Sequence, residues 1–197
     1  MPRVRSADYE DKARKVVNAA ATLFARQGYP GVRMTEIAGA CGVSKSMLYH
    51  YFKTKEDILF FIISEFLEEL AETLEKYTRR ENDQPVHDIQ DFVVSFVFRS
   101  TRSRQRNLVS TNDVKYLPTE KREAIFDLER RVIDLTAQLV GSVRPDLPKE
   151  MHRPLAFILM GILTWTDRWY RPEGRMDQPE LARLISQVFL DGINSLR

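Results

Sequence analysis

The sequence predicts an all-α protein with a small N-terminal three-helix domain and a larger helical C-terminal domain. Apolar residues recur at helical spacing nearly throughout the chain. Glycine is scarce, at 8 of 197 residues. No segment shows the sustained alternation of Val, Ile, Thr and aromatic residues that is typical of half-buried strands. We therefore expect about nine helices and no sheet.

The composition excludes several classes of protein. Hydrophobic residues make up 43% and charged residues 29% of the chain, the balance of an ordinary globular protein. The longest apolar run, residues 155–165, is too short to span a membrane, and the N-terminus lacks the apolar segment of a signal peptide. The single cysteine, Cys41, excludes an intramolecular disulfide and favours a cytoplasmic location. Cys41 and the three histidines have no metal-ligand spacing, so we expect no metal and no other cofactor.

The formal net charge of +2 conceals an uneven distribution. Residues 1–55 contain ten basic and four acidic side chains, a formal charge near +6. The remaining 20 basic and 24 acidic side chains give residues 56–197 a charge near −4. A basic N-terminal segment on an acidic remainder indicates an anionic partner for the N-terminal segment alone.

Capping signals divide the N-terminal part into three helices. A first helix with Val16 and Phe24 on its apolar face should end at Gly28. We expect Thr35 to be the N-cap of a short second helix, and Ser44 to cap a third helix over residues 45–51.

A long helix should follow from Lys55 to about Tyr77, started by a capping box between Thr54 and Asp57. Beyond a polar break at residues 79–85, we expect helices near 86–103, 105–114, 119–141, 150–170 and 178–196. Asp177 is the expected N-cap of the last helix. These elements predict a small N-terminal domain over residues 1–54 and a larger C-terminal domain over residues 55–197.

Residues 35–52 have the pattern of a helix-turn-helix. Gly42 lies where the tight turn between the two short helices needs a left-handed residue. Ile37, Val43 and Leu48 can pack the second helix of the pair against its neighbours. Lys45, Ser46, Met47, Tyr49 and His50 then face outward, where such a helix enters the major groove of DNA.

The outward residues have the chemistry that DNA recognition requires. Lys45 can reach a guanine edge or a phosphate, and Met47 can contact a thymine methyl group. Arg3 and Arg5 precede the first helix and could enter the minor groove, although a solvated terminus is an equally good interpretation. The expected DNA-binding residues are Thr35, Ser44, Lys45, Ser46, Met47, Tyr49, His50, Lys55, Arg3 and Arg5.

The run VSKSMLYHYFKTKEDIL, residues 43–59, resembles the signature of the TetR family of bacterial regulators. The upstream run AAATLFARQGY, residues 19–29, is similar to the first helix of that family. The resemblance implies an all-helical homodimer that binds a palindromic DNA operator. It implies that residues 1–54 form the helix-turn-helix DNA-binding domain and that residues 55–197 form the domain that binds a small effector and dimerises. Position 46 is often Gly, Ala or Pro in relatives and is Ser46 here. We expect this difference to affect which DNA bases are preferred and not the membership of the family.

The last two helices have the apolar surface of a dimer interface. We expect a homodimer that forms through the helices near residues 150–170 and 178–196. The alternative is that the same apolar stripes are core surfaces of a monomer. The stripe on the last helix comprises Leu181, Leu184, Ile185, Val188, Phe189 and Ile193.

Residues 165–175 contain both tryptophans and three arginines. The string Arg-Trp-Tyr-Arg-Pro-x-Gly at residues 168–174 resembles a branch of the family that senses coenzyme A thioesters. Guanidinium groups suit the phosphates of such a ligand, and indole rings suit its acyl arm. The alternative is that these residues have structural roles only. The tryptophan segment would then anchor the end of a helix, the arginines near residues 99–106 would lie on a solvated face, and Phe96 would belong to the core. The candidate ligand-binding residues are Phe96, Arg99, Arg102, Trp165, Arg168 and Trp169.

These observations predict a ligand-responsive transcriptional regulator, most simply a repressor. A bound effector, an acyl-CoA thioester being one candidate, would favour a different tilt of the helix that begins at Lys55 and so release the operator. One alternative is a DNA-binding regulator whose C-terminal domain binds a protein partner or no effector. An enzyme is disfavoured, because the sequence has no Gly-rich phosphate loop, Gly-x-Ser-x-Gly or His-Glu-x-x-His motif.

Overall fold

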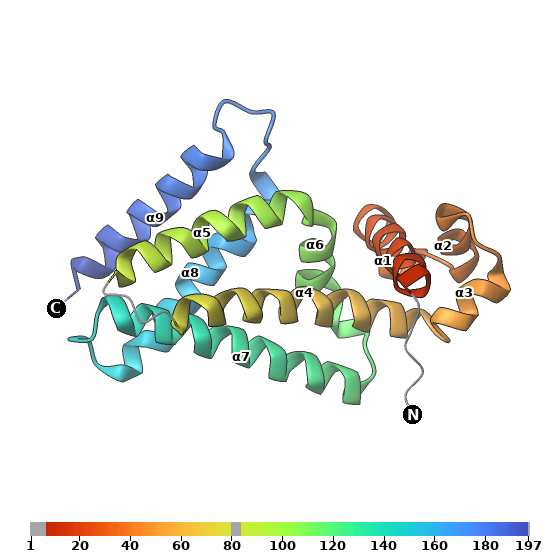
Figure 1. Ribbon diagram of the computed structural model, residues 1–197, viewed down its shortest axis with the longest axis horizontal. Helices are drawn as coiled ribbons and strands as arrows, with labels where there is room; N and C mark the ends of the chain where they lie inside the picture. Colours follow the sequence, from red (N-terminus) through yellow and green to blue (C-terminus); the bar gives the residue numbers. More distant parts are fainter. Residues whose placement is uncertain (1–6, 80–83, 197) are drawn as a thin grey trace. The chain divides into compact units, whose positions relative to one another are not determined.

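The computed structural model describes residues 7–79 and 84–196, and within them the chain is helical and has no strand (Figure 1). The all-α prediction is therefore confirmed. The helices are α1 (Ala7–Gln27), η1 (Tyr29–Gly31), α2 (Met34–Cys41), α3 (Lys45–Tyr51), α4 (Lys55–Thr78), α5 (Pro85–Arg102), α6 (Arg104–Asp113), η2 (Val114–Tyr116), α7 (Thr119–Val143), α8 (Lys149–Trp169) and α9 (Gln178–Asn194). None of these helices is long and apolar enough to cross a membrane.

Contacts within the chain define two compact units. The described part of the first, here called the head, comprises residues 7–66 and 105–125. The described part of the second, the body, comprises residues 67–79, 84–104 and 126–196. The head therefore contains α1–α3 together with the first part of α4, with α6 and with the start of α7. The boundary predicted between residues 54 and 55 stays a prediction, because it concerns functional domains rather than packing.

The core of the head forms where the apolar faces of α1, α2 and α3 meet. Val16 and Val17 of α1, Ile37 of α2 and Leu48 of α3 are fully buried. The ring of Phe24 contacts that of Tyr29 edge to face, with ring centroids 5.1 Å apart. Burial of each such side chain stabilises the fold by about 1.5–3 kcal/mol. This packing fixes one face of α3 and leaves the other free.

Helix starts follow the predicted capping pattern except at α2. Thr54 and Asp57 form the expected box: the Thr54 N–H donates to the Asp57 carboxylate (2.9 Å) and the Asp57 N–H donates to the Thr54 hydroxyl (3.1 Å). Asp177 caps α9 by accepting from the Glu180 N–H at 2.8 Å.

The prediction of Thr35 as the N-cap of α2 is wrong, because α2 begins at Met34 and Arg33 precedes it. The Glu36 carboxylate accepts the backbone N–H of Arg33 at 2.7 Å. Thr35 is therefore an exposed residue of the first turn. Arg33 and Thr35 both lie where the N-cap could be. The hydrogen bond between the Arg33 N–H and the Glu36 carboxylate favours Arg33.

The body is built around α5, α8 and α9, which contact one another. Ile89 and Phe92 of α5, Leu159 and Leu163 of α8 and Leu181 of α9 are almost completely buried. A Cβ atom on Gly141 of α7 would lie 2.7 Å from Nδ1 of His152 of α8, so these helices approach closely there. In Figure 1, α5 and α9 lie side by side along one edge of the body.

Candidate functional site

The turn between α2 and α3 has the geometry of a helix-turn-helix. Gly42 adopts the left-handed conformation, with φ 67° and ψ 28°, as its position in the sequence predicts. Its N–H donates to the carbonyl of Gly39 at 3.2 Å, and the Val43 N–H donates to the carbonyl of Ala38 at 3.1 Å. The turn thus satisfies the last carbonyls of α2 and redirects the chain into α3 within three residues.

Helix α3 begins at Lys45 and is capped by Ser44, whose hydroxyl accepts the Met47 N–H at 3.1 Å. Leu48 on its inner face is fully buried, and Phe52 just beyond it is 8% exposed. The cap and the buried leucine together set the rotation of α3 about its own axis. The opposite face is therefore presented to solvent in a defined orientation.

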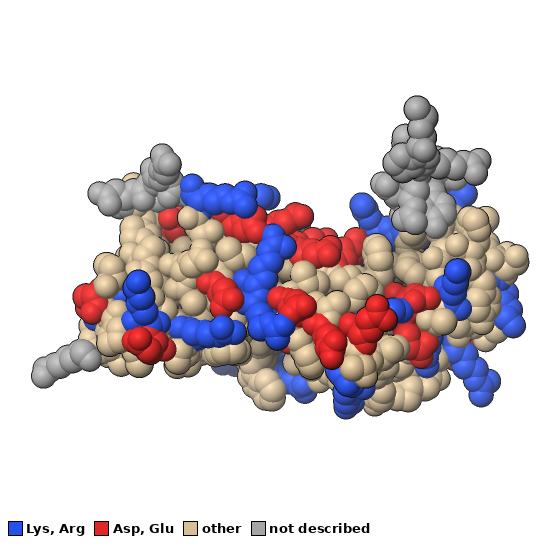
Figure 2. Space-filling view, turned by 90° about the horizontal axis from the view of Figure 1, so that it is seen from below, with Lys and Arg blue, Asp and Glu red and all other residues tan. Residues whose placement is uncertain are grey.

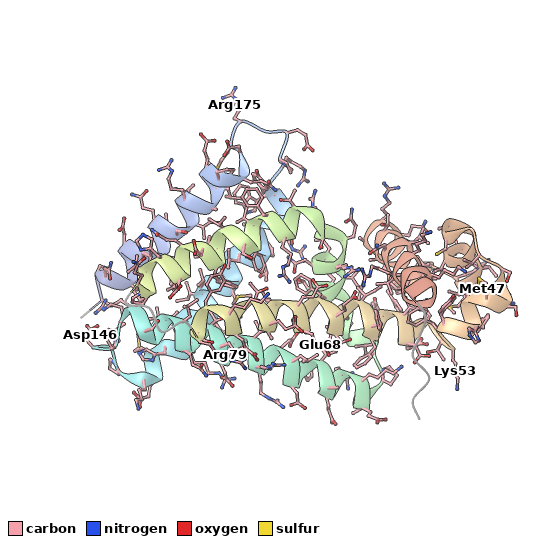
Figure 3. The ribbon with its side chains drawn as sticks, in the orientation of Figure 1. Met47, Lys53, Glu68, Arg79, Asp146 and Arg175 are labelled. Atoms are coloured by element: carbon pink, nitrogen blue, oxygen red, sulfur yellow. The ribbon has the colours of Figure 1, made fainter. Side chains whose placement is uncertain are left out.

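The solvent face of α3 carries the side chains that the sequence predicts there. Met47 is 39% and Tyr49 42% exposed, and Lys45, Ser46 and His50 are also exposed. The Lys45 ammonium lies 5.9 Å from the centroid of the Tyr49 ring. Met47 projects outward from α3 in Figure 3. A cation, a hydroxyl, a thioether, a phenol and an imidazole therefore share one helix face.

Lys55 is placed differently from the rest. Its ammonium donates to the carbonyls of Tyr29 and Val32, both at 2.9 Å, and lies 4.2 Å from the centroid of the Tyr29 ring. A phosphate contact would require Lys55 to leave these partners. Arg3 and Arg5, the predicted minor-groove arm, lie outside the described residues.

Sequence patterns do not indicate the network around Tyr29. The Tyr29 hydroxyl donates to the Glu56 carboxylate at 2.8 Å, and the Tyr29 ring stacks on that of Tyr116 with centroids 5.2 Å apart. Burial, followed by the hydrogen bond to Glu56, raises the pKa of Tyr29 well above its usual value. For Glu56, burial alone would raise the pKa, but the hydrogen bond from Tyr29 and neighbouring donors lower it overall. These partners are too far apart in sequence for a local motif to reveal them.

The N-terminal segment has an excess of basic side chains. Residues 1–55 have a formal charge near +6. On the face of the molecule that Figure 2 shows, basic and acidic side chains are interspersed. A polyanion near the outer face of α3 would be attracted to the basic N-terminal segment.

Two of the predicted ligand-binding residues have structural partners in the body. Phe96 is 3% exposed and contacts the ring of Phe92 edge to face, with centroids 6.3 Å apart. Arg99 donates to the Thr73 hydroxyl at 2.5 Å and pairs with the Glu69 carboxylate at 3.3 Å. Arg102 ends α5, and its side chain lies outside the described parts of the structure.

The other three predicted ligand residues lie on the surface. Trp165 is 59% and Trp169 54% exposed, and the Arg168 guanidinium lies 4.7 Å from the centroid of the Trp165 ring. Phe96 is buried whereas both tryptophans are exposed, so these residues do not line one enclosed cavity. A separate groove of about 760 Å³ runs between α5 and α9, and none of the six predicted ligand residues lines it. Within residues 7–79 and 84–196, no group of three or more His, Cys, Asp or Glu side chains could hold a metal ion.

Two family models match the chain. The model described as bacterial regulatory proteins of the tetR family matches residues 16–61, which include the helix-turn-helix. The model described as the tetracyclin repressor-like C-terminal domain matches residues 82–193, more than half of the chain. The chain belongs to the TetR family.

Relatives that match nearly the whole chain are transcriptional regulators. This TetR-family protein is 26% identical to the HTH-type transcriptional repressor KstR2 of Rhodococcus jostii, over 92% of the chain and 90% of the relative. It is 24% identical to the fatty acid metabolism regulator protein of Bacillus subtilis, over 93% of the chain and 96% of that protein. These relatives are regulators rather than enzymes, which agrees with the non-enzyme prediction.

Solved structures share the fold. A TetR-family transcriptional regulator from Bordetella parapertussis is 31% identical with a TM-score of 0.85, covering 96% of this chain and all of that chain. AibR in complex with isovaleryl coenzyme A and operator DNA has a TM-score of 0.78 at 23% identity, covering 90% of this chain and 97% of AibR. The architecture of a helix-turn-helix followed by a helical C-terminal domain is thus the TetR architecture.

Proposed function

We propose that this protein is a ligand-responsive transcriptional repressor that binds a palindromic DNA operator as a homodimer in the cytoplasm. The observation that carries the proposal is the outer face of α3. On that face, a helix held by the Ser44 cap and by buried Leu48 presents Lys45, Met47 and Tyr49 to solvent. Membership of the TetR family and the basic charge of residues 1–55 support it.

In this proposal α3 enters the major groove and reads base edges near its N-terminal end. Lys45 donates to a guanine edge or a phosphate, and Met47 contacts a thymine methyl group. Tyr49, His50 and Thr35 contact backbone phosphates, which sets the position of the helix without adding base preference. Ser46, where relatives often have Gly, Ala or Pro, adds one hydroxyl to the recognition surface.

The homodimer would form through α8 and α9. Phe157 and Ile158 of α8 are 56% and 54% exposed, and Val188 of α9 is 59% exposed. An apolar hollow of about 250 Å³ lies between the same two helices. Trp165 is about two turns from Phe157 and Ile158 on α8, so we assign it and Trp169 to the subunit contact rather than to a ligand cavity. Exposed apolar surface of this extent favours association.

The DNA-binding proposal is tested with the double variant Lys45→Ala/Tyr49→Ala. Both side chains are exposed, so we expect an unchanged helical signal and thermal midpoint but a loss of operator binding of at least a hundredfold. The operator is first obtained by selecting bound DNA from a random pool. Lys149→Ala, an exposed lysine of the body, is the control and should bind normally. Unchanged affinity of the double variant would contradict the proposal.

The effector is proposed to bind in the body and to lower operator affinity by differential binding to two states. Because AibR forms a complex with isovaleryl coenzyme A, acyl-CoA thioesters are the first compounds to test. Repeating the DNA selection with acyl-CoAs of different chain length should show reduced recovery with the effector. No stabilisation by any acyl-CoA or aromatic ligand in a thermal-shift screen would favour the alternative, a regulator whose body binds a protein partner or no effector.

A further inference from the structure

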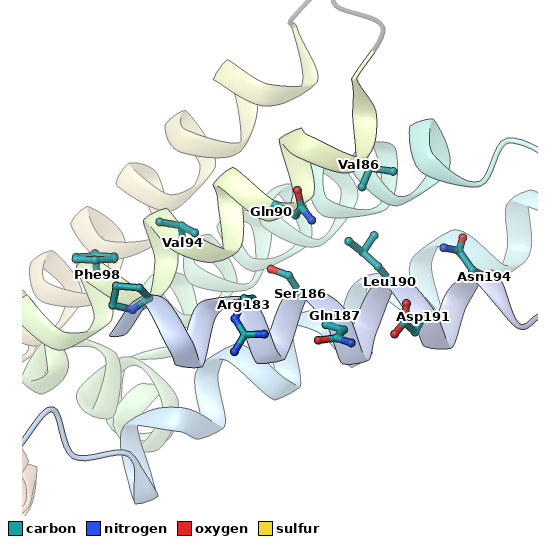
Figure 4. A pocket seen from close by; sticks show the side chains of 11 residues that line it. Val86, Gln90, Val94, Phe98, Arg183, Ser186, Gln187, Leu190, Asp191 and Asn194 are labelled. Carbon is teal, nitrogen blue, oxygen red and sulfur yellow. The ribbon is translucent and has the colours of Figure 1, made fainter. Parts of the chain in front are cut away.

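An open groove lies between α5 and α9, apart from the proposed DNA-binding and dimer surfaces (Figure 4). Its volume of about 760 Å³ lies within the range typical of small-molecule sites. Along α5 its lining extends from Val86 to Phe98, which is about 18 Å at the rise of an α-helix. The groove is therefore long enough for an extended chain of about a dozen carbon atoms.

The lining is apolar along most of the groove. Val86 and Val94 of α5 are 39% and 41% exposed, so they present apolar surface to solvent. Phe98 of α5 and Leu190 of α9 line the same groove. Covering this surface with an apolar ligand would be favourable by about 25 cal/mol for each Å² removed from water.

One polar side chain in the groove is buried without a partner. Ser186 of α9 is 4% exposed, lines the groove, and its hydroxyl has no hydrogen-bond partner in the structure. A buried hydroxyl left unpaired costs about 1–3 kcal/mol. The cost is removed when a ligand supplies an acceptor or donor at this point. Ser186 therefore marks where the polar part of a ligand would lie.

The charges of the groove determine the sign of that polar part. Arg183 lies three residues before Ser186 on α9, close enough on a helix for both to contact the same group. Within the parts of the chain that the structure describes, Arg183 forms no ion pair. Asp191 lies about 12 Å further along α9. An anionic end group would therefore be attracted to Arg183 and repelled from the Asp191 end.

We propose that the α5–α9 groove binds a linear alkyl carboxylate, with its carboxylate on Arg183 and Ser186, beside Val94, and its chain along Leu190 toward Val86 (Figure 4). The guanidinium donates charge-assisted hydrogen bonds to the carboxylate, and the Ser186 hydroxyl donates a further one. Gln90 and Gln187 line the groove near this end and can hydrogen-bond to the same group. The binding itself is independent of the proposed DNA-binding function; only a regulatory effect of the ligand rests on it.

The test is calorimetric titration of the full-length protein with decanoate below its micelle concentration. We expect one site per chain, at least tenfold weaker binding to Arg183→Gln and no measurable binding to Val94→Glu, because both changes act at exposed positions of the groove. Arg175→Gln, a surface arginine in the segment between α8 and α9, is the matched control and should bind as the parent does (Figure 3). Decyltrimethylammonium, with the same chain and the opposite charge, should not bind.

Failure of the inference is distinguishable from failure of the proposed function. Absence of decanoate binding to the parent protein would overturn the groove proposal, whatever the protein does on DNA. Equal affinity of the parent, Arg183→Gln and Val94→Glu variants would overturn it as well. Arg183-dependent binding of decanoate would support it even where the operator assay shows no DNA binding, a result that would instead contradict the proposed function.

Discussion

Lys55 and Asp57 hold the first turn of α4 through contacts that reach well beyond that helix. The Lys55 ammonium is held by two carbonyls of the segment before α2, and Lys121 of α7 donates to the Asp57 carboxylate. Thr54 adds the two hydrogen bonds of the capping box. The start of α4 is therefore joined to η1 and to α7 within the head.

The pKa of Asp57 makes this arrangement sensitive to acid. Burial alone would raise the pKa, but the hydrogen bonds from Lys121 and Thr54 lower it overall. A carboxyl whose pKa is lower in the folded than in the unfolded state stabilises the fold above its unfolded pKa. That stabilisation is lost as the pH falls through the folded pKa.

We therefore expect Asp57→Asn to lower the thermal midpoint at pH 7 by roughly 2–4 °C, as a lost capping contact of about 1 kcal/mol would. The difference from the parent should become smaller as the pH falls below the ordinary pKa of an aspartate, because the stabilisation by the ionised carboxyl is lost as the pH approaches the lowered folded pKa. Thermal melts followed by circular dichroism between pH 3 and 7 measure it. Glu68→Gln, an exposed position of α4, should show no such trend, and a constant difference for Asp57→Asn would contradict the expectation.

In the pair of α2 and α3, the position of the short helix α3 depends on the contacts at its ends. With seven residues, α3 is too short to be stable alone, so its position depends on the turn before it, the Ser44 cap and buried Leu48. Gly42 and Gly39 are three residues apart but differ in backbone conformation. Gly42 is left-handed, whereas Gly39 lies within α2.

These two glycines predict opposite effects of the same substitution. A Cβ atom would meet no atom within 4 Å at either position, so only backbone conformation decides the result. Gly42→Ala should destabilise the protein by about 1–2 kcal/mol because an L-residue is strained in the left-handed region. Gly39→Ala should stabilise it by about 0.5–1 kcal/mol because alanine favours the helix. Urea unfolding measures both, and changes of the same sign would contradict the assignment of the turn.

At the scale of the whole molecule, the proposed function requires two copies of the chain. The exposed apolar residues of α8 and α9 are the surface that a second copy would cover in the proposed homodimer. Two half-sites of a palindrome can be bound together only when two α3 helices are held at a fixed spacing. Loss of the dimer should therefore remove operator binding even though every head remains folded.

Val188→Glu tests this requirement. Because a two-fold interface contains each residue twice, two carboxylates would be buried, and we expect a monomer at micromolar concentration. Operator affinity should fall at least a hundredfold while the helical signal is retained. Val94→Glu places the same change at an exposed valine of α5, 41% exposed, and should remain dimeric. Analytical ultracentrifugation distinguishes the results, and a dimeric Val188→Glu protein would contradict the proposed interface.

Local sequence patterns were sufficient to predict the fold class, nearly all helix positions and the outward face of α3. These depend on periodicity and capping, as Ser44, Gly42 and Asp177 show. The N-cap of α2 was mispredicted because Arg33 and Thr35 are both near the start and only the Glu36 contact distinguishes them. Composition and resemblance indicate the candidate ligand residues, but neither reports whether a side chain is buried like Phe96 or exposed like Trp165.

Which distant residues meet is a property of the packed helices and could not be predicted from local patterns. The fold pairs Lys55 with carbonyls 23 and 26 residues earlier, stacks Tyr29 on Tyr116, and brings Arg183 and Ser186 of α9 beside Val94 of α5. Many sequences with the same helical periodicity would pack their helices differently. Helical spacing identifies which residues share a face, but the partner of that face is settled by the shapes and charges of side chains far away in the chain.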